Sequence, residues 1–218
     1  MKWQELYAVN GNAIPYFSDI DTFAIIKTND SNSVKKELAE KNKSLYKQFP
    51  FVTIFDCKCL SYLDLFNNPA FIKYQFIIKN LSLCIFGEDV SEQIKKFKPT
   101  NEIIENLPLL KTRINKIKNK FNQKLTSEET QQICSSIMRS ILRAGFELCI
   151  EKEKCFTKDI THCLMIFSKY FPAQKEKMKV VFDLTIVPIN DKQKITNILD
   201  DLGMWLMNIY QTVKRSTT

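Results

Sequence analysis

The feature that most constrains the fold is an acidic segment that leads directly into an apolar one, at residues 16–27. Asp19 and Asp21 are separated by one residue, and Thr22–Ile26 is rich in residues that favour β-strands. In an extended chain, side chains two residues apart point to the same face, so the two carboxylates would stand together at the start of a strand. Like charges that close repel unless a cation lies between them, and Mg²⁺ prefers oxygen ligands. Two interpretations follow: a metal-binding pair, or a polar turn before an ordinary strand.

A third carboxylate, Asp56, lies inside a second predicted strand, Phe51–Leu60. Burying a carboxylate in so apolar a run is costly without a partner. Asp56 either faces solvent on an edge strand or joins Asp19 and Asp21 on an adjacent strand of a small sheet. In the second case the carboxyl groups should converge to roughly 4–7 Å, a spacing that suits a site for two magnesium ions and a nucleoside triphosphate.

The rest of the chain divides near Pro99 and Pro108 into a half that contains strands and a half that is helical. In the first half, residues 1–15 are a short lead-in that forms either a strand or a helical turn. A helix, a second helix and a third strand are then predicted at Val34–Gln48, Ser61–Lys79 and Leu81–Phe86. In the second half, helical periodicity marks Gln131–Ile150, a helix capped by Thr157 that ends before Pro172, and Ile195–Ile209. We therefore predict an α+β protein, with a small mixed β-sheet domain at 1–98 and a C-terminal helix bundle at 99–218.

Composition indicates a globular protein without a membrane segment. The 218 residues are 44% hydrophobic and 11% aromatic, which argues against disorder. No apolar run approaches the roughly 20 residues needed to span a bilayer, and no signal-peptide core follows Met1. The seven cysteines are odd in number and scattered through apolar segments, which is typical of reduced thiols in a cytoplasmic protein. Cys57 and Cys59 lack a second cysteine pair at zinc-site spacing.

Several classes of enzyme are disfavoured. The chain has only 4 glycines and no glycine-rich phosphate loop with the Lys-Ser/Thr signature, which argues against P-loop and Rossmann enzymes. Its single histidine, His162, lies on a predicted helix and is interpreted as a structural or surface residue. The net charge of +8 indicates an anionic partner such as a nucleotide, a nucleic acid or a membrane surface, or simply a lysine-rich solvated surface.

Five segments, in the right order, resemble one known family. They are Ala13–Asp21 with its Ser-Asp-Ile-Asp motif, Phe55–Leu60, Ile77–Val90 with its Gly-Glu-Asp turn, Arg143–Phe146 and Phe156–Asp159. Together they resemble the nucleotidyltransferase superfamily, which has the polymerase-beta-like fold. The similarity is greatest to bacterial proteins of the aminoglycoside nucleotidyltransferase type, which carry a helical C-terminal domain, and it covers most of the chain.

The resemblance implies a magnesium-dependent transfer of a nucleoside monophosphate, AMP from ATP, to a hydroxyl of a small-molecule or macromolecular acceptor. Asp19 and Asp21 would hold two metal ions. Asp56 would bind one of them and act as, or orient, the general base for the acceptor hydroxyl. Three further residues would bind the nucleotide: Gly11, Asn12 and Ser18. In the helical half, Glu147 and Asp159 are either acidic groups that select a cationic acceptor or ordinary solvated helix residues.

The departure from the family lies before the aspartate pair. The family normally has a helix, a strand and a Gly-Ser turn there, and the turn holds the triphosphate; here ten residues precede Gly11 and no Gly-Ser occurs. Either Gly11-Asn12 stands in for Gly-Ser, or Leu6-Tyr7 occupies that place and the phosphate-holding turn is missing from a domain shortened at its N-terminus. The second alignment suits an alternative function, a catalytically impaired binding or regulatory protein, antitoxin-like or associated with nucleic acid.

Overall fold

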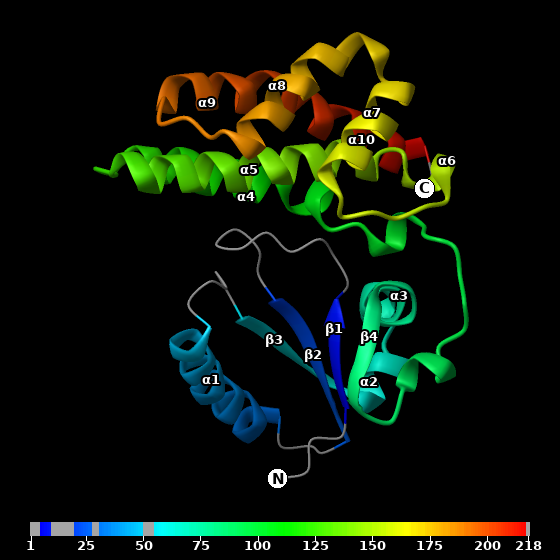
Figure 1. Ribbon diagram of the computed structural model, residues 1–218. Helices are drawn as coiled ribbons and strands as arrows, with labels where there is room; N and C mark the ends of the chain where they lie inside the picture. Colours follow the sequence, from blue (N-terminus) through cyan, green and yellow to red (C-terminus); the bar gives the residue numbers. More distant parts are fainter. Residues whose placement is uncertain (1–4, 10–19, 28–30, 50–54, 217–218) are drawn as a thin grey trace. The chain divides into compact units, whose positions relative to one another are not determined.

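The computed structural model describes residues 5–9, 20–27, 31–49 and 55–216. The chain is an α+β protein, as predicted, and it divides into two compact units, Met1–Phe97 and Lys98–Thr218 (Figure 1). The division lies one residue from the domain boundary expected from the sequence. The elements of the first unit are, in order, β1 (Glu5–Val9), β2 (Ile20–Ile26), α1 (Ser31–Gln48), β3 (Phe55–Ser61), α2 (Tyr62–Asn67), α3 (Ile72–Leu81) and β4 (Ser82–Gly87).

The strands of the first unit form one mixed sheet in the order β3-β2-β1-β4. Strand β1 pairs antiparallel with both β2 and β4, so of the two forms open to the lead-in, Glu5–Val9 takes the strand. Strands β2 and β3 pair in parallel, with Asp21 opposite Asp56 and Ile25 opposite Leu60. Helix α1 provides the connection between them, as a parallel crossover requires.

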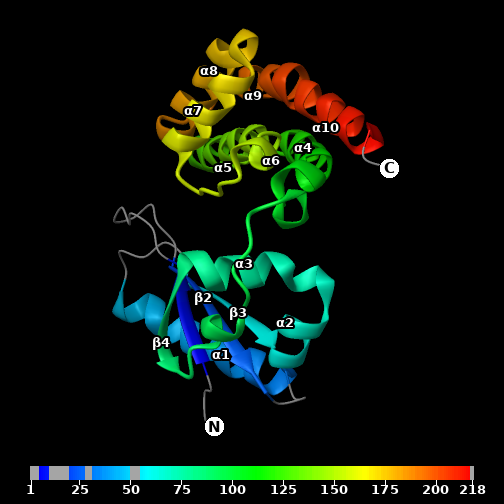
Figure 2. The same ribbon diagram turned by 90° about the vertical axis from the view of Figure 1, so that its right-hand side faces the viewer.

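Each face of the sheet is covered by helices, which can be followed in Figure 2. On one face, Phe23 and Ile25 of β2 pack with Leu60 of β3 against apolar residues of α2 and α3. On the other face, Ala24 and Ile26 pack with apolar residues of α1. The alternation along β2 follows from the two-residue period of a strand. Because both faces are buried, a slip of one residue would exchange the two sets, and the register is firmly specified.

The helix predicted at Ser61–Lys79 is divided in the structure. Its first residue ends β3, and α2 stops at Asn67. Asn68 then adopts an extended conformation, its side chain accepts a hydrogen bond from the backbone N–H of Ala70, and Pro69 begins a short 3₁₀ turn that leads into α3. Proline has no N–H to continue a helix and disfavours helical geometry at the residue before it, which explains the break.

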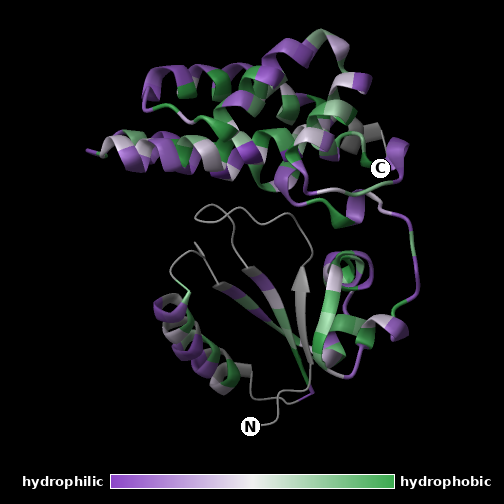
Figure 3. Ribbon diagram, in the orientation of Figure 1, coloured by the Kyte–Doolittle hydropathy of each residue, from purple (hydrophilic) through white to green (hydrophobic). Residues whose placement is uncertain are grey.

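The second unit is helical within the described residues. Its α-helices are α4 (Asn106–Phe121), α5 (Ser127–Glu147), α6 (Ile150–Glu153), α7 (Ile160–Tyr170), α8 (Lys175–Ile186), α9 (Lys192–Ile198) and α10 (Met204–Ser216). Hydrophobic and hydrophilic residues alternate along these helices (Figure 3), which gives each an apolar side to bury. Helix α5 packs against α4, α7 and α8.

Two sequence predictions for this unit need correction. The cap of α7 is Asp159, whose carboxylate accepts a hydrogen bond from the backbone N–H of His162 at 2.7 Å; the Thr157 hydroxyl instead accepts one from the N–H of Asp159. The helix predicted at Ile195–Ile209 is interrupted by a π-helical turn at Leu199–Gly203. A Cβ on Gly203 would lie 2.8 Å from the Ile114 side chain, so the turn brings backbone close to α4.

Across the described residues, none of the helices combines the length and the apolar character that crossing a membrane would need. The apolar stretches of these helices are instead used to build the two cores.

Gly145 allows α5 to approach its neighbours closely, and substituting it tests the packing. A Cβ there would lie 2.6 Å from Met178 Cε and 2.8 Å from Phe167 Cδ2, both of which belong to fully buried side chains. We expect Gly145→Ala to destabilise the protein by about 1–3 kcal/mol through overpacking, although alanine is the better helix former. Ser136→Ala, at an exposed position of the same helix, is the control and should be neutral or slightly stabilising. Urea unfolding followed by circular dichroism measures both, and a stabilised Gly145→Ala variant would contradict the packing.

All seven cysteines are free thiols, and their burial predicts which of them react. Burial raises the pKa of Cys149 and of Cys163 from 9.0 to about 12. At pH 8 a thiol with that pKa is ionised in roughly one molecule in ten thousand, and the thiolate is the reactive form. In native protein at pH 8 we expect the partly exposed cysteines to be alkylated before the buried pair, while Cys149 and Cys163 react only as the pH rises well above 9 or after unfolding. Peptide mass spectrometry after timed alkylation checks the order; early labelling of the buried pair would contradict it.

Candidate functional site

The candidate site lies on adjacent strands of the sheet, where the sequence predicted a group of carboxylates. Asp21 in β2 is the direct register partner of Asp56 in β3. Neighbouring strands are separated by about 4.8 Å, and paired residues of a parallel ladder point to the same face. Asp21 and Asp56 therefore stand side by side, on the face that Phe23 and Leu60 bury farther along the strands. Asp19, the third predicted member, lies outside the described residues.

A lysine that the sequence analysis did not single out joins the two carboxylates. Lys58 Nζ lies 3.3 Å from Asp56 Oδ2, and the Lys58 and Asp56 side chains are 48% and 44% exposed. Burial alone would lower the pKa of Lys58, but the charge of Asp56, a hydrogen bond to it and the charge of Asp21 outweigh burial and raise that pKa. The signal was available in the sequence, because a residue two positions after Asp56 in a strand must share its face.

Helix α3 contributes an aromatic residue to the same face. The Tyr74 ring lies 5.9 Å from the Phe23 ring, edge to face at 76°, and Phe23 is two residues after Asp21. The electrostatic influence of Tyr74 reaches Lys58, which places the phenol within range of the charged group. The face thus combines two acids, one base and a phenol, with apolar packing beneath them. Such a set can bind a cation between its carboxylates or hold a phosphate at its lysine.

The described residues do not by themselves complete a metal centre. Within them, no group of three or more His, Cys, Asp or Glu side chains is placed to hold a metal ion. The nucleotide-binding residues expected from the sequence, Gly11, Asn12 and Ser18, lie outside the described residues, as Asp19 does. The structure brings together Asp21 and Asp56, and it describes no other member of the predicted set.

Strand β1 contains Leu6 and Tyr7, which one of the two alignments placed at the Gly-Ser position. Leu6 pairs with Ala24 and Tyr7 pairs with Phe23, so both lie in the middle of a strand. They form no phosphate-holding turn, which is what the second alignment expects, and the strand pairing excludes neither alignment. Strand β1 ends at Val9, so Gly11-Asn12 are the residues that follow the strand in the chain.

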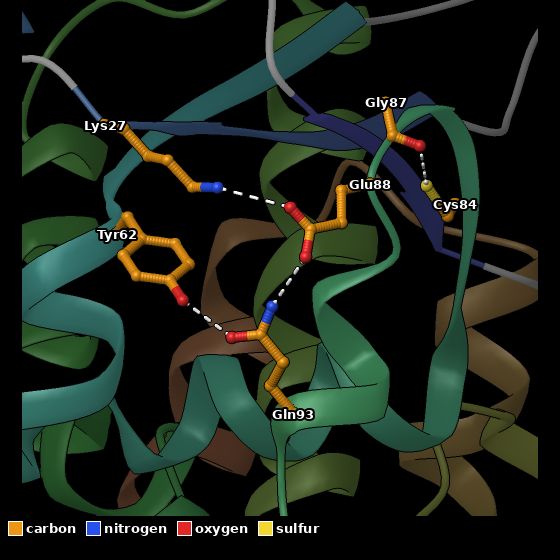
Figure 4. A network of polar contacts seen from close by, with 6 residues as sticks. All are labelled: Lys27, Tyr62, Cys84, Gly87, Glu88 and Gln93. Carbon is orange, nitrogen blue, oxygen red and sulfur yellow. Dashed lines mark hydrogen bonds and ion pairs between the residues drawn. The ribbon is translucent and has the colours of Figure 1, made fainter.

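The Gly-Glu-Asp turn has a structural role, because its glutamate connects the segment after β2 to the short helical segment that follows β4. Glu88 accepts hydrogen bonds from Lys27 Nζ at 3.3 Å and from Gln93 Nε2 at 3.0 Å, and Tyr62 Oη donates to Gln93 at 2.6 Å (Figure 4). Lys27 also lies over the Tyr62 ring, 4.9 Å from its centre. Gly87 has φ of 89°, a conformation that glycine adopts without strain. These contacts connect Lys27, six residues after Asp21, to Tyr62 at the start of α2. They therefore lie apart from the site formed by Asp21 and Asp56.

The acidic candidates of the helical unit also have structural roles. Glu147 is 3% exposed, and its carboxylate accepts four hydrogen bonds at the start of α4. Asp159 caps α7. Glu147 is therefore neither available to a cationic acceptor nor the solvated residue that the sequence also allowed, whereas Asp159 is exposed. His162 is exposed, as expected for a surface residue.

Glu147 can be tested as the anchor between α4 and α5. Its Oε1 accepts from the backbone N–H groups of Glu105 and Asn106, both at 3.0 Å, while its Oε2 accepts from the N–H of Leu107 at 2.7 Å. In Glu147→Gln an amide NH₂ must face one of these donors, so we expect a loss of about 1.5–3 kcal/mol in the free energy of unfolding. Glu151→Gln is the control, because the exposed Glu151 accepts a single long bond of 3.4 Å. Urea unfolding measures the free energy of unfolding of both variants. Equal losses in the two variants would contradict the anchoring role of Glu147.

Comparison with known proteins adds no relative to this description. No family model, no curated protein and no solved structure matches the chain.

Proposed function

We propose that the protein is a magnesium-dependent nucleotidyltransferase that moves a nucleoside monophosphate, AMP from ATP, to a hydroxyl of an acceptor. The observation that carries the proposal is the direct pairing of Asp21 with Asp56 on parallel neighbouring strands. Two adjacent carboxylates supply the oxygen ligands that Mg²⁺ prefers, and the Ser-Asp-Ile-Asp motif adds Asp19 two residues before Asp21.

The roles of the residues follow from their chemistry. Asp19 and Asp21 would hold the metal ions, and Asp56 would share one of them and accept the proton of the acceptor hydroxyl. Bound magnesium would supply charge neutralisation on the triphosphate. Gly11-Asn12, the pair that follows β1, would take the place of the family's Gly-Ser turn. Lys58 has a flexible stem and an exposed head, so it can leave Asp56 and pair with a phosphate.

A second candidate function is favoured by that same lysine. With Lys58 Nζ 3.3 Å from Asp56, the third carboxylate already has a cation in the place where a metal would bind. If this ion pair is permanent, the fold would serve a binding or regulatory protein without transfer activity. The two candidates differ in one property, which is magnesium-dependent binding of ATP.

Isothermal titration with ATP and Mg²⁺ tests the proposal on the full chain. We expect the wild-type protein to bind, and Asp21→Asn/Asp56→Asn to lose more than about tenfold in affinity, since even an outer-shell change at a metal site costs 10–100-fold. The control is Asp64→Asn/Glu92→Gln, which removes two exposed carboxylates of the same unit and the same amount of charge. Omission of Mg²⁺ should abolish the heat in wild type.

Two outcomes would contradict transfer chemistry at this site. Absence of ATP binding to the wild-type protein at millimolar nucleotide would favour the second candidate. Binding that survives loss of Asp21 and Asp56 would place the nucleotide elsewhere on the protein.

A further inference from the structure

The positive charge of the chain belongs almost entirely to the helical unit. Residues 98–218 contain 20 Lys and Arg against 13 Asp and Glu, a net charge of +7, whereas residues 1–97 contain 12 against 11, a net charge of +1. Within the helical unit the charge is concentrated again. Helix α4 and the loop after it, residues 106–125, contain six basic residues and no acidic one.

The outer side of α4 carries most of this charge. Leu107, Leu110 and Ile114 face the core and are buried. The exposed positions include four lysines, with hydroxyl and amide side chains between them: Lys111, Thr112, Asn115, Lys116, Asn119, Lys120, Gln123 and Lys124. We call these eight residues the lysine face. Helix α4 packs beside α5 and α10 (Figure 2), and all eight residues of the lysine face are exposed.

The lysine face is poorly neutralised by the protein. Among the described residues, no ion pair includes Lys111, Lys116 or Lys124, and Lys120 has only the electrostatic influence of the nearby Glu129. The other two cations of this stretch are engaged on the flanks of the helix. Lys118 pairs with Asp200, and Arg113 donates hydrogen bonds to Asn106 and Ser140.

An ordinary solvated helix surface carries charges of both signs, and helix α1 of the same chain is an example. Helix α1 mixes both signs of charge, and its Lys41 pairs with Glu37 one turn earlier. On α4, Lys116 and Lys120 are also one turn apart, and like charges at that spacing destabilise a helix. Asn115, in the middle of the helix, is a poor helix former. The face therefore has an intrinsic cost that an anionic partner would offset.

We propose that the lysine face of α4 binds the phosphate backbone of a nucleic acid. Lysine side chains and the amide and hydroxyl groups between them are the common phosphate and sugar contacts of nucleic-acid-binding proteins. From Lys111 to Lys120 the helix rises about 14 Å, at 1.5 Å per residue. That length matches about four nucleotides of one duplex strand at ~3.4 Å each. No aromatic side chain lies among the eight residues, so the contact reads the backbone and not the bases.

The same geometry argues against a membrane as the partner. A helix that binds a lipid surface lays its apolar side into the interface. The apolar side of α4 is already buried in the core of the helical unit. This inference does not depend on nucleotidyl transfer, because it concerns a different unit and a different ligand chemistry.

Fluorescence anisotropy with the full chain tests the proposal, using a labelled 20-nucleotide RNA and the corresponding duplex. The test variant is Lys111→Gln/Lys116→Gln/Lys124→Gln, which changes the net charge from +8 to +5. The control is Lys36→Gln/Lys41→Gln/Lys47→Gln, which makes the same change at exposed positions of α1. Glutamine has nearly the helix propensity of lysine, and thermal melting by circular dichroism verifies that both variants fold.

We expect wild type and the α1 control to bind with the same steep salt dependence. The α4 variant should bind at least about tenfold more weakly at 100 mM salt, and the slope of log affinity against log salt should fall by about 2–3, which is 0.7–0.9 for each phosphate that a lysine no longer neutralises. Four results would overturn the proposal: no binding by wild type to either probe at low salt, equal losses in the two triple variants, equal competition by poly-glutamate at matched charge, or binding to anionic vesicles but not to nucleic acid.

Discussion

The parallel pairing of β2 with β3 is the constraint on which the candidate site depends. Its register is set by burial on both faces: Phe23 and Ile25 pack toward α3, while Ala24 and Ile26 pack toward α1. Because the side-chain period of a strand is two, shifting β3 by one residue would move Asp56 and Leu60 to the α1 face and bring Cys57 and Cys59 to the face packed by α3. The position of Asp56 beside Asp21 is therefore enforced by the hydrophobic core.

This arrangement brings two negative charges close together, and the positive charge of Lys58 offsets their repulsion. Two carboxylates on adjacent strands repel, and the low polarity of the neighbouring core strengthens the repulsion. Lys58 is on the same face, and its raised pKa shows that its charged form is stabilised by both acids. A lysine stem is long and flexible, so in the proposed nucleotidyltransferase the same side chain would neutralise the pair before a metal binds and would pair with a phosphate afterwards.

The sequence was most informative where structure is local. The strand that contains Asp21, helix α1, and the edge strand β4 follow from periodicity and turn residues. For Asp56 the sequence allowed either the solvent side of an edge strand or a place beside Asp21, and the structure combines the two: β3 is an edge strand, Asp56 is 44% exposed, and it pairs with Asp21. It was least informative where partners are distant. Glu147 reads as a helix-surface residue, but its hydrogen-bond donors lie 40–42 residues earlier in the chain, and no local pattern indicates that they converge on it. The break at Asn68-Pro69 did have a local signal, which is the proline itself. The helical spacing of apolar residues on both sides of Pro69 nevertheless favoured one continuous helix.

The excess positive charge lies on the helical unit, so the net charge of the chain does not support nucleotide binding by the sheet. From the whole sequence, +8 indicates an anionic partner and could be assigned to a triphosphate at the carboxylate site. Yet the unit that contains Asp21 and Asp56 is almost neutral, and the excess lies on α4 of the other unit. Fields from exposed charges are screened within about 8–10 Å in physiological salt, so lysines act mainly on ligands near their own surface. The net charge is thus no argument for nucleotide binding by the sheet, and that proposal stands on the carboxylate pair and Lys58 alone.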